Sequence, residues 1–195
     1  MIKPYGNAVI FAGGKSARMG KDKALLPFGE SNSLSHFQFE KLNTLFNTVY
    51  ISAKSDKFDF EVDLIKDRYP EDSPLVGLLS IFESAEVENV FILAVDSPFV
   101  NKAVISKLMA QENDAYDAVI AKSPSGLQPL CGLYKKSIVP FVSKQYAKGD
   151  HKLTTLLSLA NTLVVDFEED ALFANLNHPK EYQAALVHYK ANLKN

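Results

Sequence analysis

The stretch Ala8-Val-Ile-Phe-Ala-Gly-Gly-Lys-Ser-Ala-Arg-Met-Gly-Lys-Asp-Lys23 combines an apolar run, paired glycines and four cations near the start of the chain. The run Ala8 to Ala12 is typical of a strand buried on both faces, and Gly13-Gly14 lets the backbone approach a ligand without interference from Cβ atoms. The cations are Lys15, Arg18, Lys21 and Lys23. We expect them on a loop over the open end of that strand, where open α/β sheets bind ligands. The stretch therefore predicts a polyphosphate site.

Length and composition narrow the class of protein. A chain of 195 residues predicts one domain, 1–195. A net charge of −2 does not favour a nucleic acid or a membrane surface as partner. The single cysteine, Cys131, excludes an internal disulfide, and its apolar neighbours predict a buried strand thiol. No apolar run approaches the ~18 residues of a membrane span, so we expect a cytoplasmic protein, and a monomer.

Strand-like and helix-like stretches alternate, which predicts right-handed crossovers and a mainly parallel sheet covered on both faces. The expected strands are Ala8–Ala12, Thr48–Ala53, Val62–Ile65, Val90–Val95, Asp117–Ala121, Leu130–Tyr134 and Leu163–Asp166. The first expected helix follows an apolar stripe from Leu34 to Phe46, and the second opens at Ser73-Pro74. Further helices are expected at Lys102–Gln111, Ile138–Tyr146 and Leu153–Leu159, and a last one begins after Asn177-His178-Pro179.

Two common phosphate motifs are excluded. Gly14-Lys15-Ser16 copies the end of a P-loop, but the glycine required five residues earlier is Val9. The register that ends at Gly20-Lys21 places Asp22 where a serine or threonine should hold magnesium. A dinucleotide fingerprint is also missing from the first turn.

The pattern that does match is Phe11-Ala-Gly-Gly-x-Ser-x-Arg-Met-Gly-x-Asp-Lys23, continued by Ala24-Leu-Leu-Pro-Phe28. It resembles the MobA-type molybdenum cofactor guanylyltransferase family. Further blocks resemble the family in the same order along nearly the whole chain: Lys66-Asp67, Ser73-Pro-Leu-Val-Gly77, Val95-Asp-Ser-Pro98, Gln128-Pro-Leu-Cys-Gly132 and Asn175-Leu-Asn-His-Pro-Lys-Glu-Tyr182. The resemblance implies a Rossmann-like, three-layer α/β/α nucleotidyltransferase fold.

The resemblance also implies a reaction, in which a phosphate oxygen of molybdopterin attacks the α-phosphorus of GTP and pyrophosphate leaves. Arg18 and Lys23 are then expected to neutralise the β- and γ-phosphates. The nucleotide is expected to contact Phe11, Ala12, Gly13, Gly14, Lys23, Ser52, Asp67 and Asp96. Ser52 stands where many relatives carry asparagine, and a hydroxyl offers fewer donors. For Lys15 and Lys21, a solvated loop explains the charge equally well.

Two aspartates follow predicted strands. Asp96 ends the most apolar strand, and with Arg18 and Lys23 it completes the expected catalytic set. Magnesium prefers one or two carboxylates with phosphate oxygens, so Asp96 is the candidate ligand for Mg²⁺ as cofactor. The alternative is an aspartate that caps the next helix or turn. For Asp67 the alternative is an ordinary surface turn.

The C-terminal block suggests an acceptor side. On an extended strand, the amides of Asn175 and Asn177 would point the same way, and we expect them either to hold the pterin phosphate or to order the site. Alternatively, Asn177 caps the helix that begins at Pro179. Pro74 to Gly77 either line the nucleoside pocket or simply open a helix. Other substrates, such as CTP with molybdopterin or a sugar or alcohol phosphate as acceptor, and a non-catalytic nucleotide-binding partner remain alternatives.

Overall fold

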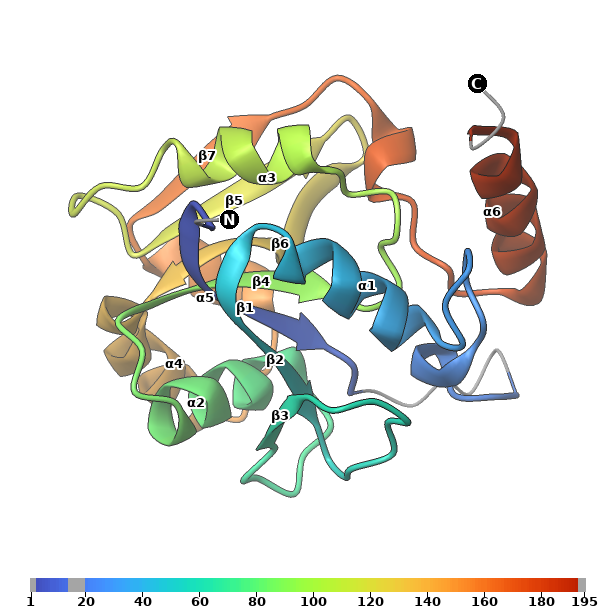
Figure 1. Ribbon diagram of the computed structural model, residues 1–195. Coiled ribbons are helices and arrows are strands. Elements are labelled where there is room, and N and C mark those ends of the chain that lie inside the picture. Colours follow the sequence, from blue (N-terminus) through green and yellow to red (C-terminus); the bar gives the residue numbers. More distant parts are fainter. Residues whose placement is uncertain (1–2, 14–19, 193–195) are drawn as a thin grey trace.

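The computed structural model describes residues 3–13 and 20–192 of the chain. The strands in this part form one seven-stranded sheet in the order β3-β2-β1-β4-β6-β5-β7 (Figure 1). The strands are β1 (Tyr5–Phe11), β2 (Phe46–Ala53), β3 (Asp63–Lys66), β4 (Asn89–Ala94), β5 (Ala118–Ser123), β6 (Gly126–Lys135) and β7 (Thr162–Asp166). Neighbouring strands run parallel except where β6 pairs with β4 and β5. The predicted mainly parallel sheet is confirmed.

Helices cover both faces of the sheet. The α-helices are α1 (Leu34–Asn43), α2 (Pro74–Ser84), α3 (Lys102–Met109), α4 (Val139–Tyr146), α5 (Leu153–Leu159) and α6 (Pro179–Asn192), and the 3-10 helices are η1 (Lys23–Leu25), η2 (Lys136–Ile138) and η3 (Asp170–Phe173). Figure 1 shows α1 and α3 over one face and α2 and α4 over the other, with α6 at the side next to α1. The buried residues of α5 belong to the same cluster as those of α2 and α4. None of the helices in the described ranges is long and apolar enough to span a membrane.

The core is divided by the sheet into two clusters of buried side chains. Along β1, Ala8 and Ile10 belong to one cluster, whereas Val9 and Phe11 belong to the other. This alternation is the period-two geometry of a strand that is buried on both faces. The three-layer α/β/α architecture is therefore confirmed.

One helix boundary was predicted wrongly. Helix α1 ends at Asn43, so Leu45 lies in a turn and Phe46 begins β2. The N–H of Leu45 donates to the carbonyl of Leu42 at 2.9 Å, which closes this turn. Leu45 and Phe46 are both buried. Their apolar character therefore reflects the core on that face of the sheet and not a continuing helix.

Strand β6 is longer than predicted, and its pairing with β5 is interrupted around Pro129. Its pairing with β5 shifts from Ile120 opposite Gly132 to Ala121 opposite Gln128. Proline has no N–H to donate to a ladder, and prolines inside sheets accordingly sit at edges or irregularities. Cys131, next along β6, is buried, as predicted, and burial raises the pKa of its thiol to about 12. Residues 129–131 are therefore unpaired with β5.

Gly132 in β6 has no room for a side chain. An added Cβ would lie 2.6 Å from Cδ1 of Ile120 and 3.1 Å from its Cα, and closer still to the carbonyl oxygen of Val119. We expect Gly132→Ala to lower the free energy of unfolding by about 1–3 kcal/mol, because the backbone of β5 must move. Urea denaturation followed by circular dichroism measures the change. Gly6→Ala in β1 is the matched control, since nothing lies within 4 Å of its added Cβ; equal stability of the two variants would contradict the prediction.

Candidate functional site

The candidate site lies where β1 and β4 end side by side at one edge of the sheet. These parallel neighbours are the point at which the strand order reverses, which is the usual ligand position in open α/β sheets. The backbone pairing continues past both strands: the N–H of Ala12 donates to the carbonyl of Ser52 and the N–H of Val95 to that of Phe11, each at 3.0 Å. The residues that follow β1 and β4 are therefore held beside one another.

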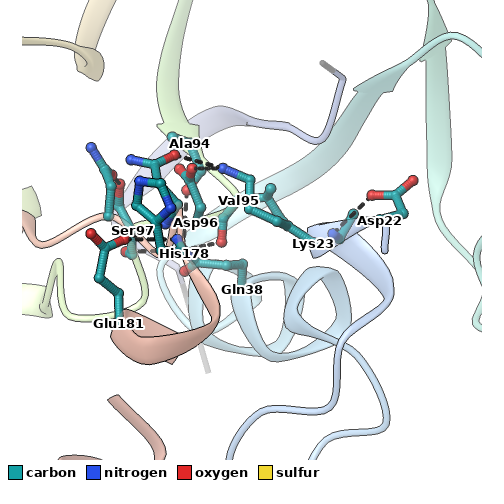
Figure 2. Close-up of polar contacts among 12 residues, drawn as sticks. Asp22, Lys23, Gln38, Ala94, Val95, Asp96, Ser97, His178 and Glu181 are labelled. Carbon is teal, nitrogen blue, oxygen red and sulfur yellow. Dashed lines mark hydrogen bonds and ion pairs between the residues drawn. The ribbon is translucent and has the colours of Figure 1, made fainter. Parts of the chain in front are cut away.

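Lys23 and Asp96 form an ion pair at this edge. Nζ of Lys23 donates to Oδ2 of Asp96 and, at 2.9 Å, to Oδ1 of Asn177 (Figure 2). The side chains of Lys23 and Asp96 are 17% and 16% exposed, so water competes little with the pair. Lys23 lies at the start of η1, which Asp22 caps by accepting the N–H of Ala24 at 3.0 Å. Three segments far apart in the sequence thus meet at one ammonium group.

The segment that carries Asn175 and Asn177 lies against the end of β4. Oγ of Ser97 donates to Oδ1 of Asn175 at 2.6 Å, and the N–H of Leu176 donates to the carbonyl of Asp96 at 3.0 Å. The segment belongs to no strand, so the expectation of an extended strand is wrong. Both amide oxygens nevertheless bind neighbours within one residue of the Lys23–Asp96 pair.

The alternative assignment of Asn177 as a helix cap is also wrong. Its amide oxygen accepts from Lys23, whereas the carboxylate of Glu181 accepts the N–H groups of Asn177 at 2.7 Å and His178 at 2.9 Å. Figure 2 shows Glu181 next to His178 in this arrangement. A carboxylate in the first turn satisfies N–H groups that a helix start leaves without partners. The side chain of Asn177 is therefore available to the site.

A first cleft opens beside Lys23 and Asp96. Its lining includes most of the residues predicted to contact a nucleotide, together with the first turn of α2. The lining residues are Phe11, Gly13, Lys23, Ser52, Asp67, Asp72, Ser73, Pro74, Gly77, Ala94, Val95, Asp96 and Leu130. Pro74 and Gly77 thus line the cleft, while Pro74 also opens α2 after the N-cap Ser73. Gly14, Lys15 and Arg18 lie outside the described residues, and Lys21 is exposed.

Gly77 gives the ring of Phe11 its place in the first cleft. A Cβ at position 77 would lie 2.7 Å from Cε1 of Phe11. Helix α2 therefore approaches the end of β1 as closely as it does only because residue 77 has no side chain. The apolar wall of the first cleft depends on this contact.

Asp67 is the second carboxylate of the first cleft. It follows β3, and its Oδ1 accepts from Oγ of Ser52 at 3.2 Å. Desolvation raises the pKa of Asp67 above its ordinary value, although the hydrogen bond from Ser52 and the charge of Lys54 oppose the shift. A Cβ at Gly13 would lie 3.6 Å from Oδ2 of Asp67, so the glycine turn passes close to this carboxylate. Asp67 is accordingly a wall of the cleft and not an isolated surface turn.

A second cleft opens on the other side of Asp96. It is formed by the end of β4, by residues 128–131 within β6, by η3 and by the two asparagines. Its lining is Ala94, Asp96, Ser97, Gln128, Pro129, Leu130, Cys131, Phe173, Asn175 and Asn177. The interruption of β6 at Pro129 brings residues 129–131 to this cleft. Ala94, Asp96 and Leu130 line both clefts. Asp96 therefore stands on their common wall.

One contact near the glycine turn was missed from the sequence. Lys57, in the connection between β2 and β3, pairs with the carboxylate of Asp22 and donates to the carbonyl of Ala12 at 3.3 Å. It thus links the end of β1 to the residue that caps η1. No local pattern around Lys57 signals this role, because both partners are more than thirty residues away in sequence.

Comparison with known proteins shows which family this chain resembles. Residues 8–165 match the model of the MobA-like NTP transferase domain. The molybdenum cofactor guanylyltransferase of Campylobacter jejuni strain 81116 is 40% identical over 179 residues, which cover 91% of this chain and 93% of the relative. The probable molybdenum cofactor guanylyltransferase of Carboxydothermus hydrogenoformans is 30% identical, over 91% of this chain and 93% of the relative.

Solved structures show the same fold. The molybdopterin-guanine dinucleotide biosynthesis protein A of Archaeoglobus fulgidus superposes with a TM-score of 0.82 at 20% identity, covering 95% of this chain and 99% of that one. The 2-C-methyl-D-erythritol 4-phosphate cytidylyltransferase of Thermus thermophilus gives a TM-score of 0.69 at 14% identity, covering 94% and 98%. The match over residues 8–165 and the 40% identity to the Campylobacter relative decide the family: the chain belongs to the MobA-like NTP transferases.

Proposed function

We propose that this protein transfers GMP from GTP to molybdopterin and releases pyrophosphate, which yields the molybdopterin guanine dinucleotide. A terminal phosphate oxygen of molybdopterin forms a bond to the α-phosphorus, and the bond from that phosphorus to the bridging oxygen of pyrophosphate breaks. The names of relatives at 40% and 39% identity support both substrates. The observation that carries the proposal is the position of Asp96 on the wall shared by the two clefts.

A wall common to both clefts suits nucleotidyl transfer, because the reaction needs its two substrates in contact. Holding two reactants in the right geometry contributes several kcal/mol, roughly 7–11, to lowering a bimolecular barrier. We assign GTP to the first cleft, which has Lys23 and the glycine turn, and molybdopterin to the second, which has Asn175 and Asn177. The α-phosphate then lies near Asp96, where the clefts meet.

Lys23 is the described cation that supports triphosphate binding. Its ammonium is held by Asp96 and Asn177 at the edge of the first cleft, so it is placed before substrate arrives. A point charge fixed in advance stabilises negative charge that develops on leaving pyrophosphate without further reorganisation. Arg18 and Gly14 remain predicted contacts of the nucleotide.

Magnesium is the proposed cofactor. No group of three or more His, Cys, Asp or Glu side chains suited to a metal occurs among the described residues. The single carboxylate of Asp96, where the two clefts meet, fits Mg²⁺. This ion usually takes one or two carboxylates and completes its shell with substrate phosphates and water. Asp96 would hold the ion, which when bound draws charge from the α-phosphate.

The direct test is a substrate panel. The protein is incubated with Mg²⁺, molybdopterin and each nucleoside triphosphate in turn, and released pyrophosphate is measured. We expect release with GTP, and only when molybdopterin is present. Release with CTP alone would replace the guanylyl assignment with a cytidylyl one. No release with any triphosphate would overturn the enzymatic proposal and favour a binding partner.

Asp96→Asn tests the shared wall. The substitution keeps the size of the side chain but removes its charge, so we expect kcat to fall roughly 10²–10³-fold, as for a lost electrostatic contact in an active site. Asp166→Asn is the matched control, because Asp166 forms an exposed ion pair with Lys122 at 3.2 Å outside both clefts. Thermal denaturation verifies that both variants fold. Turnover by Asp96→Asn at the rate of the control would remove Asp96 from the reaction.

Asp67→Asn tests how the carboxyl group of Asp67 affects the stability of the folded protein at different pH values. Because the pKa of Asp67 is raised in the folded protein, the folded state binds the proton more tightly than the unfolded one. Stability must therefore fall as the pH rises through the window between 3.8 and the raised value. The asparagine variant lacks this loss, so we expect it to gain stability relative to the wild type at pH 7 but not below that window. Denaturation at several pH values measures the difference, and a constant difference across pH would contradict it.

The same variant is expected to bind GTP more weakly, since Asp67 lines the first cleft. Isothermal titration with GTP and Mg²⁺ measures the affinity. Affinity equal to that of the wild type would remove Asp67 from the nucleotide contacts.

A further inference from the structure

Helix α1 carries polar side chains where an amphipathic helix is expected to be apolar. Ser35, Gln38 and Lys41 follow one another at spacings of three residues and therefore lie on one side of the helix. Ser35 and Gln38 are 0% exposed, and Lys41 is half-buried. Burying polar groups costs free energy unless each finds a partner. We call these three residues the α1 donor stripe.

Ser35 binds the segment of Lys23. Its Oγ donates to the carbonyl oxygen of Ala24 at 2.8 Å, and Ala24 is the neighbour of Lys23 in η1. The hydroxyl of Ser33, the N-cap of α1, lies 3.1 Å from that of Ser35. The first turn of α1 thus fixes the backbone from which the ammonium group projects.

Gln38 binds the backbone on both sides of Asp96. Its Nε2 lies 3.2 Å from the carbonyl oxygen of Ala94, 3.3 Å from that of Val95 and 3.0 Å from that of Ser97 (Figure 2). Its Oε1 is buried and has no hydrogen-bond partner in the described structure. An unpaired buried oxygen costs free energy. The contacts made by the amide nitrogen of Gln38 are therefore partly offset by the burial of its amide oxygen.

Lys41 binds the continuation of the same loop. Its Nζ donates to the carbonyl oxygens of Pro98 at 3.1 Å and Val100 at 2.8 Å. Desolvation lowers the pKa of Lys41 to about 7, and the neighbouring Cys131 on β6 weakly opposes this shift. Below that pH the amine is protonated, and its two bonds are then charge-assisted and stronger than neutral ones. Together, Gln38 and Lys41 contact five carbonyl oxygens between Ala94 and Val100.

We propose that the α1 donor stripe positions Lys23 and Asp96 relative to one another, so that Ser35, Gln38 and Lys41 are positioning residues for nucleotidyl transfer. The inference rests on the proposed function. The hydrogen bonds from the stripe to the segments of Lys23 and Asp96 all go to main-chain carbonyls. It therefore fixes the two backbones and leaves the side chains of Lys23 and Asp96 to face the clefts. Displacement of a reacting group by about 1 Å costs about 10²-fold in rate, so such support matters for turnover.

The test compares buried glutamines that differ in what they hold. Gln38→Met removes the donor from the loop of Asp96. Gln145→Met in α4 is the matched control: Gln145 is 2% exposed, its Nε2 donates to the carbonyl of Lys152 at 2.8 Å, and its Oε1 also lacks a partner in the described structure. Gln145→Met loses one buried donor contact, whereas Gln38→Met loses contacts with three carbonyl oxygens. The stability of each variant is therefore measured as well, and the Gln145 variant shows what the loss of a buried glutamine away from the clefts does to turnover.

Lys41 supplies a second, independent pair of variants. Lys41→Met removes the charged donor, whereas Lys41→Arg keeps donors at the same position. Lys107→Met is the control, because Nζ of Lys107 donates to the carbonyl of Asp166 at 2.8 Å on the exposed side of α3. Because Lys41→Arg still offers donors to the carbonyls of Pro98 and Val100, it keeps this arm informative if Gln38→Met or Lys41→Met folds poorly.

Two measurements are made on every variant: steady-state pyrophosphate release and amide hydrogen exchange at Val95 and Ser97. We expect Gln38→Met and Lys41→Met to lower kcat roughly 10–100-fold with the KM for GTP changed by less than about threefold, and Lys41→Arg to restore most of kcat. Exchange should rise at Val95 and Ser97, whose N–H groups donate to Phe11 and Ala94. The two controls should keep the kcat and the exchange of the wild type.

The inference is overturned if Gln38→Met and Lys41→Met turn over as fast as their controls while the wild type is active. It is also overturned if kcat falls without faster exchange at Val95 and Ser97, because the loop would then be unmoved. Failure of the proposed function is distinguishable, since it shows as no pyrophosphate release by the wild type itself, whatever the variants do.

Discussion

The Lys23–Asp96 ion pair is the interaction on which the candidate site depends. Its partners are 73 residues apart and come from η1 and from the end of β4. Asn177, 154 residues from Lys23, accepts from the same ammonium, so the C-terminal segment closes around the same point. Because this point lies where β1 and β4 diverge, sheet topology rather than local sequence brings the charges together.

Much of this arrangement was predictable from the sequence. The strands β1 and β4 are continuous apolar runs, which indicate burial on both faces whatever their partners are. Asp67 and Asp96 follow strands, and parallel strands of one sheet end at the same edge, so the structure brings both carboxylates to the first cleft as expected. Predicted contacts of Arg18 and Gly14 fall outside the described residues and stay predictions.

The polar contacts that the sequence did not reveal share a physical cause, which is that the deciding partner is distant in sequence. Local spacing around Gln38 suggests only an apolar stripe beside it, whereas the carbonyls that it binds are 56, 57 and 59 residues further on. Asn177 resembles a helix cap locally, yet Lys23 takes its oxygen and Glu181 satisfies the helix start. Each buried polar contact of this kind is made by one side chain, so the sequence around it shows no repeating pattern that would reveal it.

The site divides its work between main chain and side chains. The α1 donor stripe grips carbonyls, the Lys23–Asp96 pair stands between the clefts, and the ends of each cleft are built by other residues. In the first cleft, the ring of Phe11 fits only against Gly77; in the second, the interruption at Pro129 shapes the wall. Ser52, where the sequence departs from the family pattern, lies in the wall of the first cleft, and Gln128 lies in the wall of the second. We therefore expect exchanges in these walls to change which base or acceptor is held while the charge pair keeps its geometry, so that substrate choice and phosphate chemistry would vary independently of one another.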